Sequence, residues 1–422
     1  MRAHARAAAV LLSLAFAVGV AACGAATPSP PASVALPASA SEPPPTASTP
    51  PASRPSVAPS VVPTRVPAGD LGREIEIHSL DRSWTAQMLE FASDGESILY
   101  SSGAMDGSDG EYAPDLWRFQ PSTDAPELLW RNPRRDRSLV KIGGEFGTSA
   151  FVEMPLGGEI TWDFWLIPEA GQVPILLDTH PGTGAVPDFV PSFHVHQDQV
   201  AWTAFDFGPD GEALSRLLYA RAPDWTPVVV AERDARLSEL WFPSLRDTQI
   251  AYCEVVYSAD RTTDERHVYV VDAAHLDVAP RRLDTSGRAT MPILLINRGV
   301  VWKEADPGFS MFNWGTMFHY DEETGEVTRL PTRPQEYVNY PSAGARFISW
   351  WGADTRAFGV YDRDLDTTRL IDRWPAATNI SILRPHSSWE LLVWLQAEIP
   401  GDDLGQVRFA FLPSAGTDRN RD

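Results

Sequence analysis

The chain has 422 residues, a formal net charge of −21 and 43% hydrophobic residues, among them 15 Trp, 18 Phe and 10 Tyr. That apolar content is enough to build a large folded core. A protein this acidic repels the phosphate backbone of DNA and RNA, so we exclude nucleic acid as an expected partner.

Residues 1–22 have the pattern of a signal peptide. Arg2 and Arg6 precede an apolar segment that runs to Val20 and is too short to span a membrane comfortably. The segment ends in Val20-Ala21-Ala22-Cys23, which resembles the lipobox of bacterial lipoproteins, where the cysteine receives diacylglycerol. We therefore predict a lipid on Cys23 and a location at the cell membrane, on its extracytoplasmic face. The alternative is an ordinary secretory signal in which Cys23 is incidental.

The next segment has the composition of a disordered linker. Residues 24–68 contain 13 of the 37 prolines and no aromatic residue. Such a segment cannot bury enough apolar surface to fold, and its prolines favour an extended polyproline conformation. We predict that residues 23–72 consist of the lipid-attachment residue Cys23 and a disordered linker.

Residues 73–414 contain a sevenfold repeat. Its clearest element is a short apolar strand that ends in an aromatic residue, and these aromatic residues follow one another at intervals of 51, 51, 50, 50, 48 and 44 residues. The seven aromatic residues are Tyr100, Phe151, Trp202, Tyr252, Trp302, Trp350 and Trp394. In the first six repeats the aromatic strand is accompanied by three other candidate strands, and four repeats carry a proline in the strand before it: Pro191, Pro243, Pro292 and Pro341.

Four strands in each repeat of 45–50 residues predict an all-β, seven-bladed β-propeller with four-stranded blades. The last repeat offers only three strands before the polar tail at residues 415–422. An alternating segment, Glu74–His78, lies at the other end of the domain, and we expect it to complete the last blade as its outer edge. Cys253 lies in an apolar strand, where a small buried residue is favoured over a reactive thiol.

One repeat resembles a known family. The segment Phe91-Ala92-Ser93-Asp94-Gly95-Glu96-Ser97-Ile98-Leu99-Tyr100 is similar to the TolB-like (PD40/WD40-like) propeller repeat, and Tyr320–Glu326 resembles the later turn of that repeat. The other repeats have diverged from this pattern. The resemblance implies a propeller used mainly for protein association in the cell envelope, and it assigns no catalytic residue.

The connections between the second and third strands of the repeats are long and acidic. Glu153, Glu254 and Glu304 each stand two residues past the repeated aromatic residue, and Asp306 and Trp314 lie in the fifth of these connections. These five residues form a candidate ligand rim, and the alternative is that the charges only keep the loops soluble. Asp106, Asp109 and Glu111 are candidate ligands for Ca²⁺, although their spacing departs from that of a calcium loop. We expect no other cofactor.

His194-Val195-His196 places two imidazoles two residues apart, as in a metal pair, but a solvated turn is the favoured interpretation. The sequence contains no G-x-S-x-G, H-E-x-x-H or P-loop motif. We therefore expect a monomeric, membrane-anchored protein that binds an envelope protein or an extracellular ligand. A propeller hydrolase or lyase that acts on extracellular glycans or peptides is the alternative, because scattered carboxylates can form a hydrolytic pair.

Overall fold

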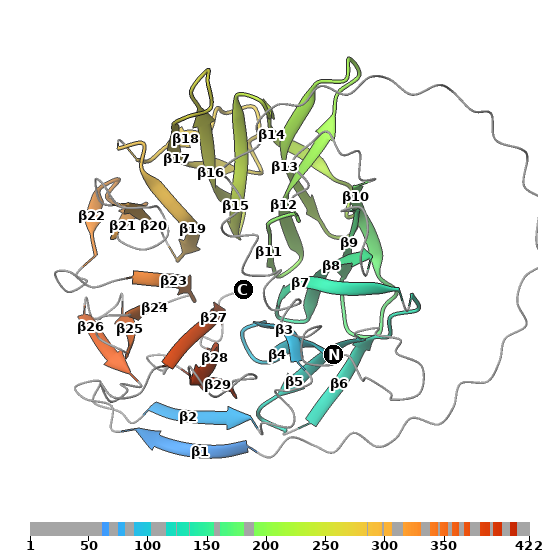
Figure 1. Ribbon diagram of the computed structural model, residues 1–422, viewed down its shortest axis with the longest axis vertical. Coiled ribbons are helices and arrows are strands. Elements are labelled where there is room, and N and C mark those ends of the chain that lie inside the picture. Colours follow the sequence, from blue (N-terminus) through green and yellow to red (C-terminus); the bar gives the residue numbers. More distant parts are fainter. Residues whose placement is uncertain are drawn as a thin grey trace, which may run out of the picture. The chain divides into compact units, whose positions relative to one another are not determined.

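The computed structural model describes seven β-sheets within residues 61–411, and Figure 1 shows them arranged as the blades of a propeller. The described residues are 61–66, 75–80, 88–102, 115–123, 125–134, 136–155, 161–180, 190–284, 286–297, 299–305, 315–330, 338–344, 347–352, 357–362, 367–371, 380–388, 391–398 and 406–411. None of them belongs to a helix that is long and apolar enough to cross a membrane.

Blades 1 to 6 are antiparallel sheets of four strands that follow one another in the chain. Blade 1 consists of β3 (Met88–Ser93), β4 (Ile98–Ser102), β5 (Asp115–Gln120) and β6 (Ala125–Trp130). Blade 2 consists of β7 (Arg137–Glu145), β8 (Thr148–Pro155), β9 (Trp162–Ile167) and β10 (Ile175–His180). Blade 3 consists of β11 (Phe193–His196), β12 (Gln199–Phe207), β13 (Ala213–Arg221) and β14 (Val228–Asp234).

The next three blades repeat this order. Blade 4 consists of β15 (Ser238–Arg246), β16 (Gln249–Tyr257), β17 (Asp264–Asp272) and β18 (Arg281–Arg282). Blade 5 consists of β19 (Ala289–Ile296), β20 (Gly299–Ala305), β21 (Gly315–Asp321) and β22 (Val327–Arg329). Blade 6 consists of β23 (Val338–Ala343), β24 (Phe347–Gly352), β25 (Ala357–Asp362) and β26 (Thr367–Ile371).

Blade 7 combines both ends of the domain, as the sequence predicted. Its strands β27 (Ile380–Ser388), β28 (Leu391–Glu398) and β29 (Gln406–Phe411) are joined by β2 (Ile75–Leu80), which pairs antiparallel with β29. A further strand, β1 (Val61–Val66), pairs with β2 in the order β1-β2-β29-β28-β27. The sequence predicted that residues 61–66 belong to the linker and that the Glu74–His78 segment forms the outer edge of this blade. In the structure, β1 forms the outer edge and β2 lies next to it.

The innermost strands form a closed ring. Each of β3, β7, β11, β15, β19, β23 and β27 contacts the next, and β27 contacts β3. In six of the seven blades, a bulge or irregularity shifts the pairing register between the innermost strand and the second strand. Pro243, Pro292 and Pro341 fall inside three of these interruptions, where the missing backbone N–H of proline costs no ladder hydrogen bond.

The core lies between blades rather than within one sheet. All seven repeated aromatic residues are buried. Tyr100 packs in one cluster with Leu391, Val393 and Phe409 of blade 7, and Trp302 packs with Val268 of blade 4. A sheet exposes apolar side chains on both faces, so stacking blades radially removes both faces from water. The predicted role of these aromatic residues is confirmed at the described interfaces.

Cys253 on β16 is also buried as expected, and it is a free thiol. Burial away from solvent raises the pKa of this thiol to about 12. At neutral pH the side chain is therefore a small apolar group and not a nucleophile.

Candidate functional site

The three glutamates that share a position in the repeat are buried in the structure. Glu153 ends up on β8, Glu254 on β16 and Glu304 on β20, each in a different blade. The fold does not bring them together into one site. Each of them instead bonds to a partner close to it, as described below.

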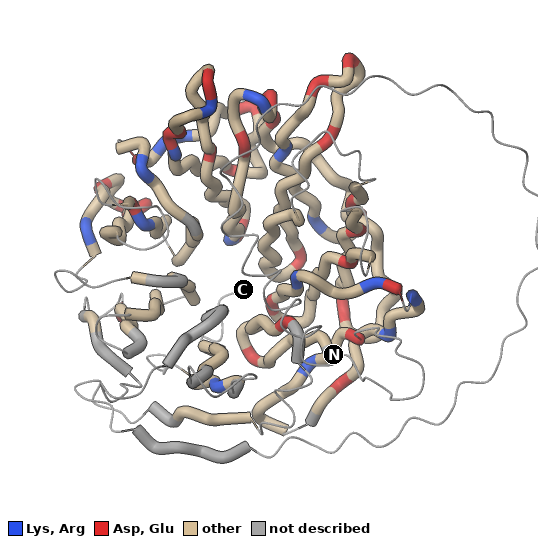
Figure 2. The backbone as a smooth tube through the Cα atoms, viewed as in Figure 1, with Lys and Arg blue, Asp and Glu red and all other residues tan. Residues whose placement is uncertain are grey.

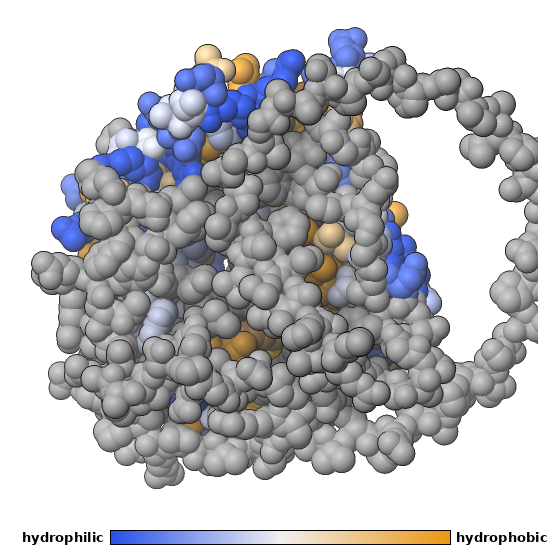
Figure 3. All heavy atoms as spheres, in the orientation of Figure 1, coloured by the Kyte–Doolittle hydropathy of each residue, from blue (hydrophilic) through white to orange (hydrophobic). Residues whose placement is uncertain are grey.

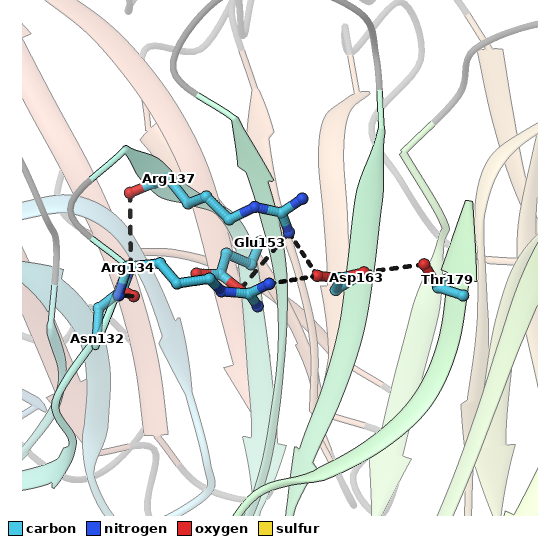
Figure 4. A network of polar contacts seen from close by, with 6 residues as sticks. All are labelled: Asn132, Arg134, Arg137, Glu153, Asp163 and Thr179. Carbon is cyan, nitrogen blue, oxygen red and sulfur yellow. Dashed lines mark hydrogen bonds and ion pairs between the residues drawn. The ribbon is translucent and has the colours of Figure 1, made fainter. Parts of the chain in front are cut away.

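Glu153 belongs to a network of charged side chains at the seam between blades 1 and 2 (Figure 4). Arg134, in the connection from β6 to β7, bonds to the carboxylate of Glu153 through Nη2 and to Oδ2 of Asp163 through Nη1 at 2.8 Å. Arg137 at the start of β7 donates to the same Asp163 oxygen at 2.5 Å. Thr179 donates its hydroxyl to the other Asp163 oxygen at 2.9 Å.

This network neutralises two facing carboxylates. Glu153 and Asp163 are direct cross-strand partners on β8 and β9, an arrangement that is destabilising for like charges unless cations lie between them. Two arginines supply that charge, so the group of four is neutral overall. Asn132 holds the connection in place, because its Oδ1 accepts the Arg134 backbone N–H at 2.8 Å.

A second arginine–glutamate pair lies at the seam between blades 3 and 4. Arg233 on β14 donates to both oxygens of Glu254, at 2.6 and 3.1 Å, and Ser238 on β15 donates to Oε1 at 2.8 Å. In both pairs the arginine comes from the chain at or after the outer strand of one blade, and the glutamate from the second strand of the next. Glu304 differs, since its Oε1 accepts the indole N–H of Trp302 at 3.0 Å.

The acidic hairpins of blades 3 and 4 also use their charges locally. Asp206 pairs with Arg216 at 2.6 Å across the β12–β13 hairpin. Hydrogen bonds from Ser258 and Thr262 lower the pKa of Asp260 to about 2, so this side chain caps its own turn. Figure 2 shows acidic and basic residues side by side on these two blades.

Several predicted site residues lie outside the described residues. These are Cys23, Asp106, Asp109, Glu111, Asp306 and Trp314. The candidate ligand rim and the Ca²⁺ site that depend on them therefore stay predictions. Among the residues that the structure does describe, no group of three His, Cys, Asp or Glu side chains is arranged to hold a metal ion.

Blade 4 carries an aromatic and arginine-containing surface at the end of β16, which we call the blade 3–4 surface because the connection from blade 3 contributes Leu237 to it. It comprises Leu237, Trp241, Tyr257 and Arg261. Leu237 is 59% exposed, and the backbone N–H of Tyr257 donates to its carbonyl at 2.9 Å, so these two residues lie opposite each other. Most of the described surface around these blades is hydrophilic, with isolated apolar residues among it (Figure 3).

The buried carboxylate of Glu239 connects the larger side chains of this surface. Glu239 accepts the indole N–H of Trp241 at 3.0 Å and the hydroxyl of Tyr257 at 2.8 Å on one oxygen. Its other oxygen accepts a hydrogen bond from Arg261 at 3.2 Å. The Arg261 guanidinium in turn lies 4.1 Å from the centre of the Tyr257 ring. Three large side chains are thus fixed in place before any ligand arrives.

The expected solvated turn at His194–His196 is wrong. These residues form β11, and His196 is buried with its Nδ1 against the carboxylate of Glu145 in blade 2. Nδ1 of His194 accepts the backbone N–H of Leu245 in blade 4 at 3.2 Å. The two imidazoles therefore bond to opposite neighbours in the ring instead of sharing a metal. The innermost strand of this repeat is only four residues long, which is why its sequence pattern predicted a turn.

Sequence reasoning missed the arginines and Glu239. No spacing rule connects Arg134 to Glu153 or Arg233 to Glu254, since each arginine reaches its partner only after the chain passes into the next blade. One available signal was that positive charge in this chain is almost entirely arginine, with Lys141 and Lys303 the only lysines. Arginine is the residue suited to buried, bidentate pairing with carboxylates.

Comparison with known proteins finds similarity in fold alone. No family model matches the chain, and no curated protein matches it. An oligogalacturonate lyase in complex with manganese is 13% identical, with a TM-score of 0.50 over 84% of this chain and 97% of that one. The β-propeller domain of the Trilobed protease from Pyrococcus furiosus is 11% identical, with a TM-score of 0.52 over 78% of this chain and 95% of that one.

A prolyl endopeptidase structure gives the same result. It is 12% identical to this chain, with a TM-score of 0.52 over 79% of this chain and 53% of that one. At these identities the likeness is one of architecture and transfers no catalytic or binding residue. What the comparisons establish is that this chain folds as a seven-bladed β-propeller of the kind also found in a lyase and in peptidases.

Proposed function

We propose that this chain is a lipid-anchored, extracytoplasmic binding protein whose propeller holds a protein partner on the blade 3–4 surface. The signal-peptide pattern and Cys23 support the location, and the proline-rich segment between Cys23 and β1 would supply the distance from the membrane. The observation that carries the binding role is the cluster of Trp241, Tyr257 and Arg261 on one buried carboxylate.

The chemistry of this cluster suits protein association. Trp, Tyr and Arg are the residue types that dominate binding energy in protein–protein interfaces, particularly next to apolar residues that exclude water. Leu237 provides such an apolar residue at the edge of the cluster. Because Glu239 already fixes the three larger side chains, a partner pays less side-chain entropy when it binds.

The contacts of Glu153 and Glu254 do not suit a hydrolase or a lyase. A hydrolytic pair needs carboxylates that can donate and accept protons at the substrate. Both glutamates are buried and engaged by arginines at blade seams, so they act on the stability of the propeller. The hydrolase or lyase alternative therefore receives no support from these residues.

The test is capture of envelope proteins by the purified chain and by two matched variants. Leu237→Asp places a charge on the blade 3–4 surface, while Val173→Asp places the same charge on blade 2, where Val173 is 84% exposed. We expect Leu237→Asp to lose the captured partner at least about ten-fold, as expected for a residue in an interface core, and Val173→Asp to retain it. Equal capture by both variants would remove the blade 3–4 surface from the proposal.

A further inference from the structure

A cavity of about 350 Å³ lies between blades 4 and 5, at the end of these blades opposite to the β16–β17 hairpin. The outer strand β18 has only two residues, and the connection before it, residues 273–280, contributes His275, Val278 and Ala279 to the lining. Two turns shape this connection: the N–H of His275 donates to the carbonyl of Asp272 at 3.0 Å, and the N–H of Val278 to that of His275 at 3.0 Å.

The interior of the cavity is apolar and comes from both blades. Val270 on β17 faces Leu295, Val300 and Tyr320 of blade 5. Leu295, Val300 and Tyr320 belong to the core cluster between the blades, so the walls are fixed by packing that does not depend on a ligand. The volume falls at the lower end of the range for small-molecule sites, which suits one ring or a short branched chain.

One cation stands at this cavity without a counter-ion. The Arg281 guanidinium lies 4.4 Å from the centre of the Tyr320 ring, and within the described part of the chain it forms no ion pair. Its neighbour Arg282 is different, because its Nη2 donates to the Asp284 carboxylate at 3.4 Å and its Nε to the Asp284 backbone carbonyl at 3.1 Å. A guanidinium stacked on an aromatic ring keeps its edge N–H groups free, and these match the two oxygens of a carboxylate.

The other polar groups at the cavity are two donors and two carboxylates. The amide of Gln249 and the imidazole of His275 add hydrogen-bond donors to those of Arg281. Asp272 keeps its negative charge while its Oδ1 accepts the backbone N–H of Ala274 at 2.9 Å, and Glu322 lies exposed in the turn after β21. Neither carboxylate forms an ion pair with Arg281 within the described part of the chain, so the guanidinium remains the group at this cavity that can pair with an anion.

We propose that this cavity binds a small carboxylic acid with an apolar or aromatic body. The body would lie against Val270 and Val278, over the buried side chains of Leu295 and Val300, and the carboxylate would pair with Arg281 at the mouth. This site is separate from the blade 3–4 surface, and neither proposal requires the other.

The probe is 3-phenylpropionate, with 3-phenylpropanol and 3-phenylpropylamine as matched ligands that share its body. Binding to the purified full chain is measured by calorimetry and by saturation-transfer NMR at moderate salt. We expect the acid to bind at least about ten-fold more tightly than the alcohol or the amine, the margin of a charged hydrogen bond. Tighter binding of the amine, equal binding of all three, or no binding of the acid would overturn the proposal.

Variants locate the site. Arg281→Gln should weaken the acid about ten-fold or more and leave the alcohol unchanged, whereas Arg282→Gln should leave both unchanged. Val278→Asp adds a negative charge at the exposed mouth, where Val278 is not part of the core, and should also weaken the acid. Retained affinity in both Arg281→Gln and Val278→Asp would show that the acid binds elsewhere and contradict the proposal.

Discussion

Two regions of the middle strands in blades 3 and 4 differ in what they contact: the part at the repeated aromatic residue and the part beyond it. β12 and β16 run five residues beyond Trp202 and Tyr252, to Phe207 and Tyr257. The β12–β13 and β16–β17 pairs each have an unbroken register of nine residue pairs.

This difference separates two tasks within one repeat. The aromatic residue and the strand around it build the interface with the preceding blade, and this part is common to all the blades. The end of β16 carries Tyr257 and leads into the hairpin with Arg261, and both residues belong to the blade 3–4 surface. Stability thus depends on the shared part, and the proposed binding role on the extension.

The largest effect should follow from removing the shared aromatic residue. Trp202→Ala in blade 3 and Trp350→Ala in blade 6 each empty a fully buried position, and each should lower the free energy of unfolding by about 3–5 kcal/mol. Chemical denaturation of both variants measures this. A large loss in one blade and almost none in the other would contradict the idea that all the blades share one structural anchor.

A smaller loss should follow from breaking a seam between blades. Glu153→Gln leaves Arg134 and Arg137 with only Asp163 as a counter-ion, and it should cost about 2–4 kcal/mol, below a fully buried pair because Arg134 is partly exposed. Glu232→Gln is the control, since Glu232 forms an exposed pair with Arg216 and should cost at most about 1 kcal/mol. Equal costs in thermal melts would argue against a structural role for the buried pair.

The smallest effect concerns pH and is confined to blade 3. Burial lowers the pKa of His194 to about 4, below the value of about 6.5 for the unfolded chain. As the pH falls, the unfolded chain binds a proton first, so the stability contributed by neutral His194 is complete above pH 6.5 and is lost between pH 6.5 and 4. The loss should reach at most about 3 kcal/mol.

His194→Ser is the matched variant for this effect. Ser244 occupies the same register position in blade 4, and its Oγ accepts the backbone N–H of Leu295 at 2.8 Å as His194 accepts that of Leu245. The serine should therefore keep the hydrogen bond while it flattens the stability profile between pH 4 and 6.5. An unchanged profile would assign the acid sensitivity to other groups, of which Glu145 is the nearest candidate.

The sequence predicted the blades well because their periodicity comes from local requirements. Each blade needs an apolar strand ending in a large side chain, and the closing strand β2 needs an alternating pattern, so both are visible without coordinates. The prolines of the innermost strands were visible too, but that they occupy bulges depends on how each strand pairs.

The candidate site was less predictable because its partners come from different blades. Glu153 and Glu254 were singled out correctly as equivalent positions, yet Arg134 and Arg233 reach them only through the stacking of neighbouring sheets. Glu239 was not noticed, since one carboxylate among 56 acidic residues has no distinguishing pattern until Trp241, Tyr257 and Arg261 surround it.

The most direct test of the central claim is site-specific photo-crosslinking on intact cells that produce this chain. A photoreactive amino acid is placed at Leu237 on the blade 3–4 surface, or at Val173 on blade 2 as a control that is more exposed than Leu237. If the blade 3–4 surface binds a protein partner, position 237 should give one discrete protein adduct that is absent at position 173. Adducts of equal yield at both positions, or none at position 237, would contradict it.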